Sequence, residues 1–132
     1  MDARHRRGQT SEYTAACWFS TQGWEVFWSN LGQSSVDFLI VRDNIVQAVQ
    51  VKSAVKIAAP NGTEHLRVNM VRGRKNKRIL YKPFSYDILC VCSADGRIWV
   101  IPAKNVPQKT NITIIRNNKS RYKEWLVKAP QI

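Results

Sequence analysis

The stretch VDFLIVRDNIVQAVQVKSA, residues 36–54, decides the fold. It contains two runs rich in β-branched and aromatic residues, 36–42 and 45–54, which are separated only by Asp43 and Asn44. Such residues favour strands, and a two-residue connection of Asp and Asn is typical of a tight hairpin turn. The sequence therefore predicts an antiparallel β-hairpin with its turn at Asp43 and Asn44.

The expected register of this hairpin brings three polar side chains to one face. If Arg42 pairs with Ile45, then Asp37 lies opposite Gln50, and directly opposed residues have Cβ atoms about 4.5–5.5 Å apart. Lys52 stands two residues beyond Gln50, so the alternation of side chains along a strand places it on the same face. One short hairpin thus assembles a carboxylate, an amide oxygen and an ammonium group.

This trio of groups suits metal-assisted phosphodiester hydrolysis. Mg²⁺ prefers oxygen ligands, and it commonly takes one or two carboxylates while keeping waters and a substrate phosphate. A lysine beside the metal can orient or help deprotonate the attacking water, or neutralise developing charge. The spacing alone leaves an alternative open, in which Asp37 and Lys52 form an exposed cross-strand pair and Gln50 is an ordinary strand residue.

The rest of the chain reads as further helices and strands of the same domain. A helix is expected over 10–22, because apolar residues recur there and Gly23 follows as a stop signal. Strands are expected at 24–28, 66–71, 86–92, 97–103 and 111–117, with a closing helix at 119–128. We therefore expect one domain over 1–132, of the mixed α/β (α+β) class, with a central mixed β-sheet flanked by helices.

The cysteines are expected to be structural. A hairpin turn at Asp95-Gly96 would pair Cys92 with Trp99 and Cys90 with Ile101, which places both thiols in the core. No second cysteine pair or His-x₃₋₅-His follows, so a zinc site is not expected. An odd number of cysteines, three, indicates reduced thiols and a cytoplasmic location.

The charge balance points to a polyanionic partner. The 132 residues include 21 Lys and Arg against 9 Asp and Glu, a formal net charge of +12, and basic side chains gather in three runs. Nucleic acid is the expected partner, although an acidic protein or an anionic membrane surface fits the composition alone. No apolar run approaches the ~18 residues of a membrane span. The residues expected to contact DNA are Arg6, Arg7, Arg72, Arg74, Lys75, Lys77 and Arg78.

Six short motifs in order resemble a known family. They are Gly8-xxx-Glu12, Gly-Trp-Glu-Val at 23–26, Val-Asp-Phe-Leu-Ile at 36–40, Gln-Val-Lys-Ser at 50–53, Tyr-Asp-Ile-Leu at 86–89 and Trp-Val-Ile-Pro at 99–102. Together they resemble the PD-(D/E)XK nuclease superfamily, and most closely its small branch that reads Q-x-K, which includes a bacterial group I intron homing endonuclease. The resemblance covers most of the chain.

The resemblance implies a role for each site residue. Asp37 would be the principal metal ligand, Lys52 the catalytic lysine, and Gln50 the replacement for the usual second carboxylate. Glu12 would reach the site from the helix, and the backbone carbonyl of Val51 would be a further ligand. Glu12 has an alternative explanation as an acid in the first turn of its helix, where the macrodipole favours negative charge.

The activity that follows is a Mg²⁺-dependent DNA endonuclease of the homing type, with Mn²⁺ able to substitute. Because a double-strand break needs two sites, we expect a homo-oligomer, a dimer or tetramer, on double-stranded DNA. Apolar residues at 125–127 or 112–115 are the candidate interfaces. A junction resolvase or repair nuclease on the same fold is an alternative. A catalytically silent nucleic-acid-binding module is another, favoured by the amide at position 50.

Overall fold

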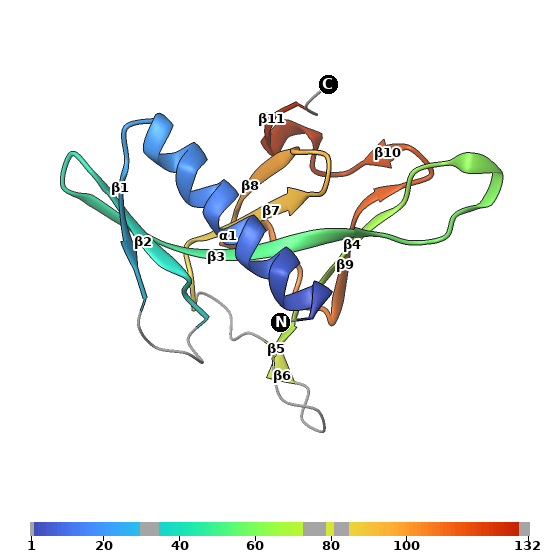
Figure 1. Ribbon diagram of the computed structural model, residues 1–132, viewed down its shortest axis with the longest axis horizontal. Helices are drawn as coiled ribbons and strands as arrows, with labels where there is room; N and C mark the ends of the chain where they lie inside the picture. The colour runs from blue at the N-terminus through green and yellow to red at the C-terminus, as the bar shows by residue number, and fades with distance from the viewer. Residues whose placement is uncertain (1, 30–34, 73–78, 81–84, 130–132) are drawn as a thin grey trace.

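One long strand organises the molecule. In the computed structural model, which describes residues 2–29, 35–72, 79–80 and 85–129, strand β3 (Ile45–Lys56) crosses the whole molecule (Figure 1). It pairs antiparallel with β2 (Phe38–Arg42) and β4 (Leu66–Asn69), and parallel with β7 (Ile88–Ser93). The result is a mixed sheet around β3, which confirms the central mixed β-sheet expected from the sequence.

The other elements extend this sheet or connect its strands. The order is β10-β9-β4-β3-β7-β8-β11, with β2 on β3 and β1 on β2, while β5 and β6 form a separate pair. The remaining strands are β1 (Glu25–Trp28), β5 (Val71–Arg72), β6 (Ile79–Leu80), β8 (Ile98–Pro102), β9 (Asn111–Arg116), β10 (Lys119–Ser120) and β11 (Leu126–Lys128). Short 3₁₀ turns occupy Pro60–Gly62, Ala103–Asn105 and Lys123–Trp125.

The predicted hairpin and its turn are confirmed. Asp43 and Asn44 have φ values of 52° and 64°, and both values are the left-handed conformation that a tight two-residue hairpin turn requires. The register runs from Arg42 opposite Ile45 to Phe38 opposite Val49. The local turn chemistry therefore set the register, as expected.

The helix is longer than predicted. Helix α1 runs over Ala3–Thr21, because the side chain of Asp2 accepts a hydrogen bond of 2.9 Å from the amide of His5 and caps the N-terminus. Glu12 consequently lies in the middle of the helix. The first-turn explanation for this residue is wrong, because the macrodipole acts only within the terminal turns.

The sheet carries a hydrophobic cluster on each face. On one face α1 packs through Ala15 and Phe19 against Phe38 and Val49. On the other face the curled sheet closes on itself, and the members of that cluster include Leu66, Val68, Leu89, Trp99 and Ile114. Within the described residues α1 is the one α-helix, so it covers one face and β4 and β9 cover the other.

The closing helix predicted at 119–128 is wrong. Asn117 and Asn118 have φ values of 50° and 66° and form a second tight turn, which folds β10 back onto β9. The segment then pairs as β11 with the edge of β8, and the side chain of Tyr122 is buried in the core. The free edge of β8 offers backbone partners, whereas an isolated helix shorter than ~12 residues is only marginally stable.

The hairpin around Gly96 differs from its predicted register by one residue. Cys92 pairs with Ile98, and Cys90 pairs with Val100, because the amide of Ser93 bonds to the carbonyl of Arg97 and leaves three residues in the loop. The predicted pairing with Trp99 and Ile101 is therefore wrong. The two thiols are nevertheless buried in the core beneath α1, and all three cysteines are free.

The candidate interfaces differ in exposure. Ile112, Ile114 and Ile115 are buried in the protein's own core and cannot form an interface, whereas Leu126 and Val127 are 37% and 41% exposed. None of the described helices is long and apolar enough to cross a membrane.

Candidate active site

The site lies at a gap along one edge of β3. Strand β2 pairs with β3 only as far as Val49, and β4 pairs with it only from Val55. The amide of Val51 points to the β2 edge, and the amide of Ile57 bonds to His65 beside β4. Alternate residues of a strand direct their amides to the same edge, so β2 and β4 share this edge. Residues 50–54 pair there with neither strand, and their backbone groups need other partners.

Asp37 fills this gap. Its Oδ2 accepts hydrogen bonds from the amide of Val51 at 2.7 Å and from Nε2 of Gln50 at 3.1 Å. Its own amide donates to the carbonyl of Val49 at 2.8 Å. The predicted opposition of Asp37 and Gln50 is therefore present, and the carboxylate takes the place of a strand neighbour.

The gap lets side chains from both faces of the sheet meet. Val49 and Val51 belong to the cluster beneath α1, so the alternation along β3 places Gln50 and Lys52 on the opposite face. Glu12 projects from α1 on the first face, and its carboxyl group shares a hydrogen bond with that of Asp37. The four predicted side chains thus converge at one edge of the sheet.

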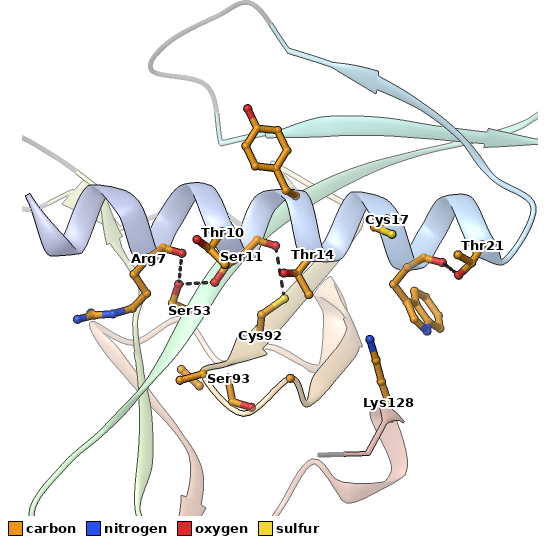
Figure 2. A pocket seen from close by; sticks show the side chains of 15 residues that line it. Arg7, Thr10, Ser11, Thr14, Cys17, Thr21, Ser53, Cys92, Ser93 and Lys128 are labelled. Carbon is orange, nitrogen blue, oxygen red and sulfur yellow. Dashed lines mark hydrogen bonds between the residues drawn. The ribbon is translucent and has the colours of Figure 1, made fainter. Parts of the chain in front are cut away.

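Hydrogen bonds between α1 and the sheet set the position of Glu12. Figure 2 shows Ser53 between two groups of the helix, with its hydroxyl 2.6 Å from that of Ser11 and 3.5 Å from the carbonyl oxygen of Arg7. The thiol of Cys92 donates to the carbonyl of Ser11 at 3.6 Å. These contacts fix the rotation of the helix one residue before Glu12. From the sequence, Ser53 was part of a motif only, and no local signal marked Ser11.

Burial shifts the pKa values of all three ionisable groups. Burial, together with the hydrogen bond and the charge of Asp37, raises the pKa of Glu12 to about 7. Burial also raises the pKa of Asp37, against the lowering effects of the Val51 amide, Glu12 and the charge of Lys52. The pKa of Lys52 is lowered by burial, which the charge of Asp37 opposes. The two acids therefore hold a proton close to neutral pH, and the lysine is less basic than usual.

The amide of Gln50 is a buried polar group of the site. The residue is 4% exposed, and its Nε2 donates to Asp37 and, at 3.2 Å, to the carbonyl of Val51. Its Oε1 is buried without a hydrogen-bond partner. The described residues contain no group of three or more His, Cys, Asp or Glu that could hold a metal. A metal here would therefore need the amide or carbonyl oxygens of Gln50 and Val51 beside Asp37 and Glu12.

A pocket of about 480 Å³ opens onto these groups. From α1 its wall includes Arg4, Arg7 and Gly8, and from the β4–β5 region it includes Asn69. Arg4, Gly8 and Glu12 recur at the spacing of one helical face, which would have revealed Arg4 had the helix been expected to begin at Ala3. Asn69 carries no such signal, because only the pairing of distant strands brings it to the pocket.

A relative of this chain matches it over most of its length. Protein 5.3 of Escherichia phage T7 is 30% identical over 119 residues, which cover 90% of this chain and 97% of the relative. The chain belongs to the protein 5.3 family. No model in the scan of family models matches it.

The fold of this protein 5.3 family member is similar to that of a solved nuclease. The bacterial homing endonuclease I-Ssp6803I superposes with a TM-score of 0.75 over 95% of this chain and 89% of its own, at 20% sequence identity. At this identity the likeness shows the fold, which agrees with the mixed α+β class expected from the sequence.

The basic residues expected to contact DNA lie in different places in the protein 5.3 fold. Arg7 lines the site pocket, and Arg6 is exposed on α1. Arg72 belongs to β5, but its side chain lies outside the described residues, as do Arg74, Lys75, Lys77 and Arg78. Among the described residues, the two arginines at the pocket, Arg4 and Arg7, come from the helix, and Lys52 comes from β3.

A larger hollow of about 890 Å³ lies along another side of α1 (Figure 2). Thr14, Cys17, Trp18 and Lys128 are among the residues that line it, and its described lining contains no carboxylate and no histidine. The groups suited to hydrolysis therefore gather at the smaller pocket.

Proposed function

We propose that this protein is a metal-dependent DNA endonuclease that hydrolyses phosphodiester bonds at the gap in the sheet. One observation carries the proposal: Glu12, Asp37, Gln50 and Lys52 meet at a single pocket, with both carboxylic acids raised in pKa and the lysine lowered. Buried groups with perturbed pKa values in a cleft are typical of catalytic sites. The net charge of +12 and the fold shared with a homing endonuclease support DNA as the substrate.

The donor set at the gap fits Mg²⁺. Nε2 of Gln50 donates hydrogen bonds to Oδ2 of Asp37 and to the carbonyl oxygen of Val51. Both oxygens are groups that would attract a cation. A half-turn of this amide would present the unpartnered Oε1 at the same place. Asp37, Glu12 and the Val51 carbonyl complete an all-oxygen set with two carboxylates, which is the number that Mg²⁺ commonly takes. Bound there, the ion would supply Lewis acidity and lower the pKa of water, and Mn²⁺ prefers similar ligands.

The protein's own residues would transfer a proton from the attacking water and hold the substrate phosphates. Lys52 lies beside Asp37, and its lowered pKa makes it better able to take a proton from an attacking water than an ordinary lysine. In its charged form it would stabilise the negative charge that develops on the phosphate. Glu12, with a pKa of about 7, can accept or release a proton near neutral pH. Arg4 and Arg7 at the pocket wall would hold the neighbouring phosphates.

We assign the protein to the PD-(D/E)XK type, as a site-specific nuclease of the homing kind that works as a dimer or tetramer. The Q-x-K motif at 50–52 and its pairing with Asp37 support the type. Two sites related by a two-fold axis would cut both strands of a duplex. Sedimentation at micromolar concentration, with and without DNA, tests the assembly, and a strict monomer in both conditions contradicts it.

A plasmid-nicking assay tests the function. The parent protein should cleave supercoiled DNA with Mg²⁺ and lose this activity in EDTA. Asp37→Asn should abolish cleavage while duplex binding persists. Asp43→Asn is the matched control, because it makes the same chemical change at an exposed turn where asparagine tolerates the left-handed conformation. Binding without cleavage by the parent would contradict the nuclease and favour a silent DNA-binding module.

A further inference from the structure

We propose that the outer face of β4, β9 and β10 is a second DNA-binding surface, which holds the phosphates of a duplex next to the cleavage site. The choice of duplex DNA as the partner rests on the proposed function. The five side chains that carry the inference are Arg67, Lys109, Arg116, Lys119 and Arg121, and none of them is among the residues that the sequence analysis assigned to DNA.

These cations line one concave surface. A pocket of about 670 Å³ is bounded by Arg67 from β4, Lys109 from the loop before β9, Arg116 from the end of β9, and Lys119 and Arg121 from β10 and the residue after it. These elements lie together at one side of the molecule (Figure 1). Like charges repel, so five cations around one hollow favour an anionic occupant.

No acidic residue compensates this charge. All nine Asp and Glu residues lie in the described part of the chain, and none of them lines the pocket. The ion pairs found among the described residues are His5 with Asp2, and Arg97 with Glu64 and Asp95. A merely solvated charged surface usually mixes both signs, whereas a surface of one sign is typical of contact with nucleic acid.

The surface is continuous with the site pocket along β4. Arg67 and Asn69 alternate with the buried Leu66 and Val68, so they share the outer face of the strand. Two residues of a strand span about 6.6 Å, and Asn69 itself lines the site pocket. A single molecule can therefore contact both pockets across β4.

Polar side chains on β9 extend this path. Thr113 lies opposite Arg67, and Asn111 lies opposite Asn69, and both line the cationic pocket. Hydroxyl and amide groups can bond to phosphates or to base edges. A long polyanion fits this arrangement better than a small anion, because the cations are spread along β4 and the stretch 109–121. Duplex DNA supplies such an occupant, with one charge per ~3.4 Å along each strand.

Three exposed cations provide the test. In Arg116→Gln/Lys119→Gln/Arg121→Gln the changed side chains are outside the core. The control Lys104→Gln/Lys123→Gln/Lys128→Gln removes the same formal charge at positions that do not line the pocket. Binding to a labelled duplex is measured in EDTA over a range of salt concentrations, with single-stranded RNA of matching length as a second probe. Cleavage of plasmid in Mg²⁺ is measured separately.

The salt dependence decides the outcome. If all three cations contact phosphates, the slope of log K against log salt becomes shallower by ~2.7, since each contact contributes ~0.9 on duplex DNA. The control should change the slope far less. Equal slopes in the two triple variants would overturn the proposed DNA-binding surface. Cleavage by the parent in the same experiment would still support the nuclease function. If the parent binds the duplex without cleaving DNA, only the proposed nuclease function is overturned. If the parent does not bind the duplex, the nuclease function and the DNA-binding surface are both overturned. A preference for the RNA would overturn duplex DNA as the partner.

Discussion

Two charged clusters in this protein have opposite electrostatics. At the first, Arg97 donates to Glu64 at 2.6 and 2.8 Å and forms an ion pair with Asp95 at 3.0 Å. The hydrogen bonds from Arg97 lower the pKa of the Glu64 carboxyl group. At the second, Glu12 and Asp37 lie together beside Lys52, and burial raises the pKa values of both acids.

The difference separates a structural clamp from the proposed active site. Arg97 ties the loop after β3 to the turn after β7, and each charge there has an opposite charge in contact. At the gap in the sheet two acids share one hydrogen bond, and the amide oxygen of Gln50 has no partner. Uncompensated groups of this kind destabilise a fold unless a ligand completes them, so the comparison predicts different consequences of mutation.

The largest effect should come from Lys52. Lys52→Met should lower the cleavage rate by about 10²- to 10⁴-fold, the usual contribution of a group that transfers a proton, while duplex affinity stays close to that of the parent. Plasmid cleavage and duplex binding in EDTA measure the two quantities. Cleavage at the parental rate would remove Lys52 from the chemistry.

Arg97→Met should lower the stability of the fold and leave the cleavage rate unchanged. It leaves Glu64 and Asp95 without their cation, so the free energy of unfolding should fall by about 2 kcal/mol, and cleavage by the folded protein should be unchanged. Urea denaturation measures the stability, with Lys104→Met as the exposed control. An unchanged urea midpoint would show that the clamp does not stabilise the fold.

Substitution of Gln50 tests whether the buried amide belongs to a metal site. Gln50→Glu adds a charged oxygen and should lower the Mg²⁺ midpoint of cleavage, whereas Gln50→Ala should raise it by about tenfold, at the lower end of ligand-shell effects. Titration of cleavage with Mg²⁺ measures both midpoints. If neither midpoint moves, Gln50 is outside the coordination shell.

Glu12 and Glu64 should give stability slopes of opposite sign. The folded protein holds a proton on Glu12 between its ordinary pKa near 4.5 and about 7, so the free energy of unfolding falls as pH rises through that window. Glu12→Gln should flatten this slope. The pKa of Glu64 is lowered in the folded protein, so its stabilising effect is lost as pH falls, and Glu64→Gln should cost most at neutral pH. The Glu64 effect is lost only below its ordinary pKa of 4.5, so urea denaturation in EDTA from about pH 3 to pH 8 tests both signs. Parallel profiles for the two variants would contradict the contrast.

The smallest effect should come from Gly8, which lies inside α1. A Cβ added there meets no atom within 4 Å, so Gly8→Ala should raise the free energy of unfolding by about 0.5–1 kcal/mol through helix propensity. Thermal denaturation measures the change, with the exposed Gln9→Ala on the same helix as a control. A lower melting temperature would show that this face of α1 has no room for a side chain.

Local patterns predicted a large part of this architecture. The turn at Asp43 and Asn44 determined the hairpin register, and the register placed Asp37 against Gln50. Predictions failed where local signals were weaker than long-range pairing. The segment 119–128 has helix-forming residues, yet Lys119–Ser120 pair with β9 and Leu126–Lys128 pair with the edge of β8. The helix start was missed because apolar residues recur only from about residue 10, whereas the cap at Asp2 begins the helix at Ala3.

The sequence by itself determined the β2–β3 hairpin, the face shared by Asp37, Gln50 and Lys52, and the strong positive charge. These follow from interactions between residues close in the chain, where turn conformation and side-chain alternation leave few choices. Only the tertiary structure decided where β2 and β4 leave β3, and thus the gap in which Glu12 meets Asp37. It also decided that Arg67, Arg116 and Arg121 surround one hollow. Such placements depend on the packing of distant strands, whose pairing no local signal encodes.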